Sequence, residues 1–361
     1  MFSPLALRPG VTTPNRVWLA PLTNMQSHPD GACSDAEAHF LGRHADGGFG
    51  LVMTCAAHVA QDGKAWAGEL GVHDDAMLAG LTRLAARIHA PADDGPRPVA
   101  CVQLFHGGLR ADPVVSGLPT WSASAYAEPG CPPPRAATED DLHRVIGQFA
   151  SAARRCADAG FDAVELHGAH GYLLSQFQST VYNQRSDAWG GSLVNRARLI
   201  RETTRAVRAA APGLAVLVRL SPEDFGQAKG IDLDETITLA RWLAEDGMDV
   251  LHLSLWRSAT TTVKRPESHA TPLFREAVGA AVPIVVAGGI WTRADAEAQL
   301  ARGADAVALG RSAIANFDWP RRAASGAPIA TPPLSAAHLV DQGLSPAFVA
   351  YMRRWKGFVA E

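Results

Sequence analysis

Short apolar runs recur eight times along the chain, and each one leads into a polar loop followed by residues with helical spacing. Strands that alternate with helical segments predict βαβ units and a parallel sheet. Eight such units predict an α/β fold in which the sheet closes into a (β/α)8 TIM barrel. The expected strands are Val17–Pro21, Leu51–Ala56, Val99–Leu104, Ala163–Leu166, Val216–Leu220, Val250–Leu253, Ile284–Ala287 and Ala306–Leu309.

Two of the intervening helices carry recognisable start signals. Ser34 is followed three positions later by Glu37, which is the spacing of a capping box. Thr138 and Asp141 have the same spacing, and the helix that they open is expected to run to about Ala159.

Two connections are longer than ordinary barrel loops. Residues 105–137 are rich in Pro, Gly and Ser and are expected to form a cap over the barrel mouth, and residues 167–192 form the other long connection. Long loops inside a compact domain are usually functional. No shift of composition marks a second domain, so residues 1–361 are expected to form one domain with a C-terminal tail at about 345–361.

Composition narrows the class of protein. The chain has 361 residues, of which 47% are hydrophobic and 19% charged, which suits a compact enzyme with a large core. A formal net charge of −3 favours neither nucleic acid nor an anionic membrane as a partner. No apolar run approaches the roughly 18 residues that a membrane-spanning helix needs.

The N-terminus and the cysteines indicate the compartment. Met1–Pro4 has neither the basic nor the apolar region of a secretory signal. The five cysteines are scattered without a C-x-x-C pair, which favours a reducing compartment and argues against a zinc or Fe–S site. We therefore expect a cytoplasmic protein.

One stretch concentrates chemically active side chains. His167, His170 and Tyr172 follow the fourth expected strand and alternate with Gly168 and Gly171. The glycines predict a loop just past the strand end, where TIM barrels carry their active sites. A metal pair or a buried core histidine are the competing interpretations, but no third metal ligand stands at a suitable spacing.

Three other strand ends carry polar residues. Thr23 follows the first strand, Gln103 lies at the end of the third, and Arg219 lies within the fifth. An amide can both donate and accept, which suits a planar heterocycle, and a guanidinium inside an apolar strand should meet an anion. Backbone caps and a structural ion pair remain open as alternatives.

The last two strands carry the clearest phosphate signal. Gly288 and Gly289 follow the seventh strand, and Gly310 and Arg311 follow the eighth at the start of a short helix. Phosphate sites in these barrels lie after strands seven and eight, at a helix N-terminus. We therefore predict that backbone amides here bind a phosphate.

Taken together, these motifs resemble those of the Old Yellow Enzyme family of FMN-dependent NAD(P)H oxidoreductases, and are closest to its two-histidine bacterial members. The similarity covers nearly the whole chain. Its most specific parts are Glu165–Leu174 and the later Asn183–Arg198 segment, with Arg185-Ser186-Asp187 and Gly190-Gly191-Ser192.

The resemblance implies FMN as the cofactor. Gln103 would bind the pyrimidine edge of the flavin, Arg219 would stabilise the anionic reduced ring, and Thr23 would bind O4. The residues implied in cofactor binding are Pro21, Leu22, Thr23, Ala56, Gln103, Arg219, Gly288, Gly289, Gly310 and Arg311.

The resemblance also implies the reaction. His167 and His170 would hold the carbonyl oxygen of an activated alkene, such as an enone, enal or maleimide, while Tyr172 would protonate the α-carbon. Hydride would pass from flavin N5 to the β-carbon. With no separate nucleotide domain, NAD(P)H and the alkene would use one site in turn. Met25 and Arg353 would contact the substrate.

The chain departs from the family pattern at three positions. The two-histidine members often have Cys at the position of Thr23, Tyr at that of Met25 and Glu at that of Cys55. A reductase of nitro compounds, nitrate esters or quinones is a second interpretation, and a flavin-binding sensor or redox partner is a third. The C-terminal tail resembles one that enters a neighbouring subunit, so we expect a homo-oligomer in which Arg353 or Trp355 of a neighbour completes the mouth. A tail that packs on its own barrel is the alternative.

Overall fold

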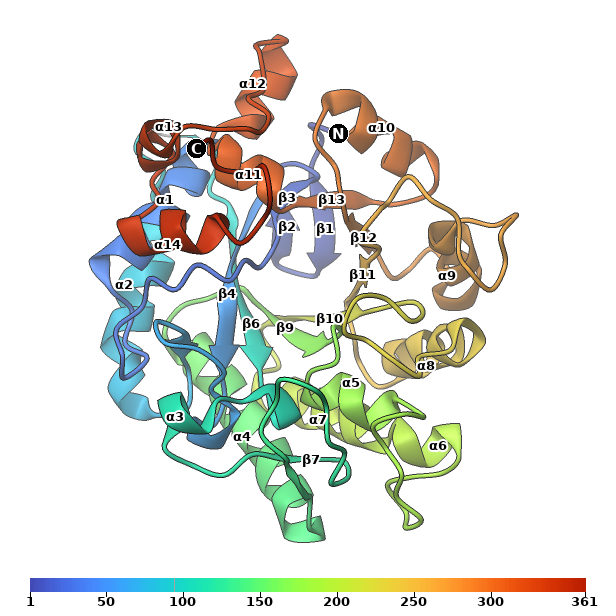
Figure 1. Ribbon diagram of the computed structural model, residues 1–361. Coiled ribbons are helices and arrows are strands. Elements are labelled where there is room, and N and C mark those ends of the chain that lie inside the picture. Colours follow the sequence, from blue (N-terminus) through green and yellow to red (C-terminus); the bar gives the residue numbers. More distant parts are fainter. Residues whose placement is uncertain (94) are drawn as a thin grey trace.

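Eight parallel strands form a closed barrel at the centre of the molecule (Figure 1). The structure is a computed structural model that describes residues 1–93 and 95–361. The short strand β5 (Leu70–Gly71) only extends the sheet beside β4, while pairing of β3 with both β13 and β4 closes the ring. The barrel strands are β3 (Val17–Leu19), β4 (Leu51–His58), β6 (Val99–Phe105), β9 (Ala163–Gly168), β10 (Ala215–Leu220), β11 (Val250–Ser254), β12 (Ile284–Ala287) and β13 (Ala306–Leu309).

The predicted TIM barrel is therefore confirmed, and every expected strand is present. All residues of these strands are buried, because the sheet packs on its own interior on one side and on helices on the other. This explains why the strands read as continuous apolar runs rather than as alternating ones.

Helices surround the barrel and follow its strands in order (Figure 1). The covering helices are α1 (Asp35–Asp46), α2 (Leu78–His89), α4 (Glu139–Asp158), α7 (Arg198–Ala210), α8 (Leu233–Glu245), α9 (Ala270–Val278), α10 (Arg293–Ala301) and α11 (Arg311–Ala315). Shorter helices lie in the loops and the C-terminal region: α3 (Pro113–Ser116), α5 (Leu173–Gln178), α6 (Leu193–Arg196), α12 (Trp319–Ser325), α13 (Ala336–Asp341) and α14 (Pro346–Met352).

The two predicted helix starts differ in outcome. Thr138 and Asp141 form the full capping box of α4, which ends at Asp158. Ser34 caps α1 by accepting a hydrogen bond from the Glu37 backbone N–H at 3.1 Å. The Glu37 carboxyl makes no return bond to the cap, and neither of its oxygens has a hydrogen-bond partner among the described residues, so this capping box is only half formed.

An N-terminal hairpin closes the end of the barrel where the strands begin. Strands β1 (Leu5–Arg8) and β2 (Val11–Thr13) pair antiparallel, and Leu7 and Val11 belong to the same apolar cluster as Trp18 and Met53 inside the barrel. Because this end is plugged, the carboxyl ends of the strands form the accessible mouth.

The 105–137 connection and the C-terminal tail both lie on the side of the barrel mouth. The 105–137 connection contains η3 (Gly108–Arg110), α3, β7 (Trp121–Ser122) and β8 (Arg135–Ala136) between β6 and α4. The C-terminal tail packs on its own barrel, since Phe348 of α14 is fully buried with its ring 5.2 Å from that of Phe40 in α1 (Figure 1). Two further 3-10 turns are η1 (Gln61–Gly63) and η2 (Asp75–Met77).

Within the part of the chain that the structure describes, no helix is both long and apolar enough to cross a membrane. All five cysteines have free thiols.

Candidate active site

Three adjoining cavities open at the carboxyl ends of the barrel strands. We call them the inner cavity, of about 220 Å³, the glycine cavity, of about 180 Å³, and the outer cavity, of about 760 Å³. His170, Trp256 and Trp355 line all three, so the cavities form one connected site.

Polar side chains from neighbouring strands line the inner cavity. Gln103 extends from β6, His167 from β9 and Arg219 from β10, and all three are more than nine-tenths buried. They meet because parallel strands present their carboxyl ends at one edge of the barrel. The wall is completed by Pro21, Leu22, Thr23, Ala56 and Tyr172.

The glycine cavity is built from the loops after β12 and β13. Gly288 and Gly289 have φ of +141° and +65°, conformations that L side chains rarely adopt. A Cβ added at Gly289 or Gly310 would meet only one atom within 4 Å, at 3.5 Å, so these backbones face open space. Arg311 lines the same cavity and begins α11.

The two histidines and the tyrosine lie together, but not all in a loop. The expectation that all three follow the strand is wrong for His167, which is part of β9 because the pairing with β10 continues to Gly168. His170 and Tyr172 follow in the loop. The ring centroid of His167 lies 4.9 Å from that of His170 and 5.0 Å from that of Tyr172.

Both imidazoles are neutral near pH 7. Burial lowers the pKa of His167 and of His170 well below the usual value, and the Arg219 charge lowers both further. The backbone N–H of Ala169 donates to Nδ1 of His167 at 3.4 Å, which leaves the ring proton of His167 on Nε2. His167 can therefore donate one hydrogen bond into the cavity.

His170 adopts a left-handed backbone conformation, with φ of +60°. Its Nε2 lies 2.7 Å from the hydroxyl of Ser254, which also accepts a hydrogen bond from Arg219 at 3.1 Å. If the Ser254 hydroxyl donates to Nε2, the proton of His170 resides on Nδ1. The strained backbone at a cavity wall is typical of functional residues.

Tyr172 retains its proton over a wide pH range. Burial raises the pKa of Tyr172 to about 12, although the nearby Arg110 acts in the opposite direction. Its ring lies 4.6 Å from that of Phe105 in an edge-to-face arrangement, which fixes the position of the phenol. The phenol lines both the inner and the outer cavity.

Arg219 is a buried cation with unused donors. Burial lowers the pKa of its guanidinium, while the charge of Glu165 acts in the opposite direction. Its Nε has no partner among the described residues. Such a group is costly to bury alone and favours an electron-rich ligand in the inner cavity.

Sequence reasoning assigned no role to two buried residues beneath this site. Glu165 of β9 accepts a hydrogen bond from Gln103 at 2.7 Å, and its other oxygen lies 2.6 Å from Nδ1 of His252 in β11. The available signal was a charged or ionisable residue inside an apolar strand run, which is costly to bury without a partner.

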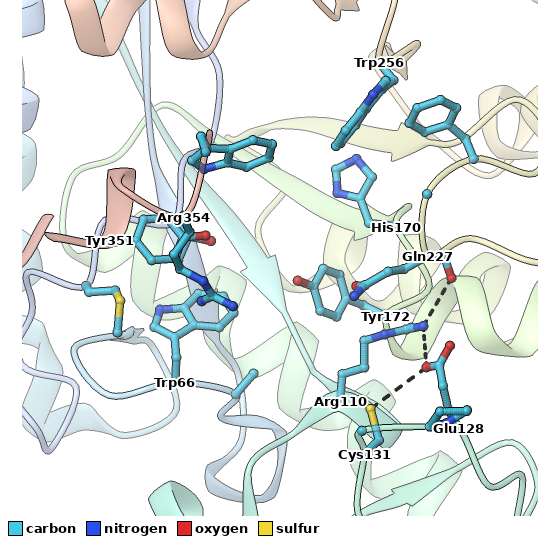
Figure 2. Close-up of a pocket in the computed structure, with 18 residues that line it drawn as sticks. Trp66, Arg110, Glu128, Cys131, His170, Tyr172, Gln227, Trp256, Tyr351 and Arg354 are labelled. Carbon is cyan, nitrogen blue, oxygen red and sulfur yellow. Dashed lines mark hydrogen bonds and ion pairs between the residues drawn. The ribbon is translucent and has the colours of Figure 1, made fainter. Parts of the chain in front are cut away.

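The outer cavity is lined by several aromatic rings and by charged side chains (Figure 2). Arg110 and Glu128 form an ion pair at 2.5 Å, and Arg110 also donates to the carbonyl of Gln227 at 3.2 Å. Met25 lines the same cavity. The aromatic lining residues are Trp66, Tyr172, Phe225, Trp256, Tyr351 and Trp355.

Of the two tail residues expected at a mouth, Trp355 lines all three cavities of its own barrel. Arg353 is exposed and lines none of these three cavities, whereas Tyr351 and Arg354 line the outer one. Trp355 lies on the mouth of its own barrel, with its ring 6.1 Å from that of Trp256 and the Arg311 guanidinium carbon 5.1 Å from its centroid.

Among the residues described, no group of three or more His, Cys, Asp or Glu side chains is arranged to hold a metal ion.

Comparison with known proteins gives consistent matches. Residues 1–329 match the family model described as "NADH:flavin oxidoreductase / NADH oxidase family". The chain is 36% identical over 335 residues to the probable NADH-dependent flavin oxidoreductase YqiG of Bacillus subtilis, covering 90% of this chain and 88% of that protein. It is 33% identical over 319 residues to an NADPH dehydrogenase of Halalkalibacterium halodurans, covering 87% and 91%. The fold is similar to that of morphinone reductase, with a TM-score of 0.83, 28% identity and coverage of 94% and 92%.

Proposed function

The chain belongs to the NADH:flavin oxidoreductase / NADH oxidase family, and from this premise we propose that it reduces the C=C bond of activated alkenes with NAD(P)H. Its general activity is that of an NAD(P)H-dependent flavin oxidoreductase. Enones, enals and maleimides are the proposed substrates. The observation that carries this proposal is the meeting of two neutral histidines and a protonated tyrosine at the inner cavity.

FMN is the proposed form of the flavin. The open backbone at Gly289 and Gly310, beside Arg311, suits a terminal phosphate. The inner cavity offers the Gln103 amide and the Arg219 guanidinium to the polar edge of a flat ring. When bound there, the flavin supplies the hydride that the alkene receives at its β-carbon.

The histidines activate the substrate in this proposal. A carbonyl oxygen that accepts hydrogen bonds from His167 and His170 withdraws electrons from the conjugated β-carbon. Negative charge grows on that oxygen during reduction, where neutral N–H donors already stand, as in an oxyanion hole. Neutral imidazoles can fill this role, because each keeps one ring N–H that it can donate to the carbonyl oxygen.

Tyr172 supplies the proton in this proposal. Its phenol lines both the inner and the outer cavity, so it can reach a substrate that lies between them. With a pKa of about 12 it is protonated at neutral pH, as a general acid must be. The α-carbon then receives a proton from the protein instead of from solvent.

An anaerobic experiment tests the proposal. The bound flavin is reduced with NADPH or NADH, the excess nicotinamide is removed, and cyclohexenone is added. Return of the oxidised flavin spectrum, together with formation of cyclohexanone, supports alkene reduction. Reoxidation by a quinone or a nitro compound alone would instead favour a reductase of those substrates.

The cofactor is tested separately. Flavin released by acid from the purified protein should migrate on chromatography as FMN, because the glycine cavity suits one phosphate. Recovery of FAD would contradict the assignment while leaving the flavin oxidoreductase activity in place.

A further inference from the structure

The amide of Gln103 is held from behind by a buried carboxylate. Nε2 of Gln103 donates to Oε1 of Glu165 at 2.7 Å, and the two residues lie opposite each other on the paired strands β6 and β9. Glu165 is fully buried and Gln103 is 2% exposed, so solvent does not compete for this bond.

His252 holds the second oxygen of Glu165. Its Nδ1 lies 2.6 Å from Oε2, and His252 is fully buried in β11. Burial lowers the pKa of His252, so the ring is a neutral imidazole whose single proton lies on Nδ1 and is donated to Glu165. Both oxygens of Glu165 therefore accept, which is the pattern of a carboxylate.

This arrangement determines the orientation of the Gln103 amide. A carboxylate only accepts hydrogen bonds, so the nitrogen of the amide must face Glu165 and not its oxygen. The carbonyl oxygen and the second N–H of Gln103 then remain for the inner cavity that Gln103 lines. An acceptor beside a donor is complementary to an imide edge, in which an N–H stands beside a carbonyl.

We propose that Glu165, supported by His252, is a positioning residue that orients the Gln103 amide so that the inner cavity selects a ring with an imide N–H. This inference rests on the proposed function, because the ring in question is the flavin. Glu165 itself touches neither the substrate nor the cavity, and it acts only through Gln103.

The charge of Glu165 has a second consequence. It acts on the buried Arg219 guanidinium, which lines the same cavity. A negative charge close to the ring opposes the extra electrons of the reduced form, since like charges repel strongly at low dielectric. Removal of this charge should therefore raise the midpoint potential of the bound flavin.

The test compares FMN with 3-methyl-FMN, in which the imide N–H is replaced by a methyl group. Flavin is removed from the wild-type protein, and the dissociation constants of the two compounds are measured by quenching of flavin fluorescence. Wild type should bind 3-methyl-FMN roughly 5- to 10-fold more weakly for the lost hydrogen bond alone. In Glu165→Gln the ratio of the dissociation constants of 3-methyl-FMN and FMN should fall toward one. The neutral amide at position 165 can both donate and accept, so the Gln103 amide can rotate by 180° and present either of its ends to the cavity.

A matched control is Glu37→Gln. Glu37 is a fully buried carboxyl on α1 that lines none of the three cavities. This variant should retain the wild-type ratio and midpoint potential. His252→Phe is the second test variant, because it keeps Glu165 and removes the hydrogen bond from His252. It should also lower the ratio of the two dissociation constants, and it provides the test if Glu165→Gln does not fold.

The outcomes separate the two proposals. If wild type binds no FMN, the proposed function is wrong. If wild type discriminates between the compounds, and Glu165→Gln and His252→Phe discriminate equally well with an unchanged potential, Glu165 is only structural and the inference is overturned.

Discussion

Tyr172 illustrates how a single side chain takes its properties from its surroundings. Its ring packs against Phe105 and His167, and burial raises its pKa to about 12. The same burial keeps His167 and His170 neutral. Burial in one apolar setting thus keeps two imidazoles neutral and one phenol protonated, which is the combination that the proposed alkene reduction uses.

Tyr172→Phe should slow reduction of enones by about 10²–10⁴, the usual range for one general acid. The ring and its packing remain, so flavin reduction by NAD(P)H should change little. Rapid mixing of pre-reduced enzyme with cyclohexenone measures the first rate, and mixing of oxidised enzyme with NADPH measures the second. An unchanged enone rate would leave proton delivery to solvent.

The histidines should affect the same half-reaction. His167→Ala or His170→Ala should slow alkene reduction by about 10²–10³, the typical effect of losing one oxyanion donor. Reduction of the flavin by NAD(P)H should be affected far less, because the nicotinamide develops no oxyanion. Separate stopped-flow measurements of the two half-reactions provide the comparison, and equal losses in both would contradict the assigned role.

At the scale of elements, the C-terminal tail completes the mouth of its own barrel. Phe348 and Met352 of α14 are buried, and this anchors Trp355 beside Trp256 at the junction of all three cavities. Arg353 is exposed and so remains available to a neighbouring subunit. The homo-oligomer stays a prediction, while the position of Trp355 favours action within one chain.

Subunit complementation distinguishes the two arrangements. Trp355→Ala should impair substrate binding, and mixed oligomers of Trp355→Ala with His167→Ala chains should show no restored activity if Trp355 serves its own site. The two chains are co-expressed with different tags, purified in sequence and assayed, with light scattering to establish the oligomeric state. Recovery of activity in the mixed species would mean that Trp355 enters a neighbouring mouth.

At the scale of the whole molecule, buried histidines make stability depend on pH. Burial lowers the pKa of His44 to about 4 and of His58 to about 3. Between these values and 6.5 the unfolded chain binds protons that the folded chain does not, so stability falls as the pH decreases. Each proton that only the unfolded chain binds lowers the free energy of unfolding by up to about 1.4 kcal/mol for every pH unit of acidification.

Buried acids have the opposite effect on the pH dependence of stability. Burial raises the pKa of Glu37 to about 7 and that of Glu69 well above its usual value, so these groups stabilise the fold at low pH and lose this effect as pH rises. More histidines have a lowered pKa than acids have a raised one, since His73, His167, His170, His252 and His269 join His44 and His58.

The urea midpoint of the FMN-saturated protein should therefore fall between pH 7 and pH 5. Unfolding followed by far-UV circular dichroism at constant ionic strength measures it. A midpoint that stays constant or rises over this interval would show that the acids outweigh the histidines.

The barrel could be predicted from the pattern of apolar residues alone. Eight apolar runs predict eight buried strands, because a strand covered on both faces must be apolar throughout. Strand ends also marked Gln103, Arg219 and the glycines after β12 and β13, since parallel strands bring their carboxyl ends to one edge. These conclusions depend only on local pattern and on the geometry that all such barrels share.

The contacts across the barrel could not be predicted from local pattern and became visible only in the folded chain. Glu165 and His252 are 87 residues apart and their pairing carries no local signal, because it depends on the closure and register of the sheet. The same holds for the tail, where burial of Phe348 against Phe40 brings Trp355 rather than Arg353 to the mouth. Local pattern determines which elements form, whereas packing determines which side chains meet.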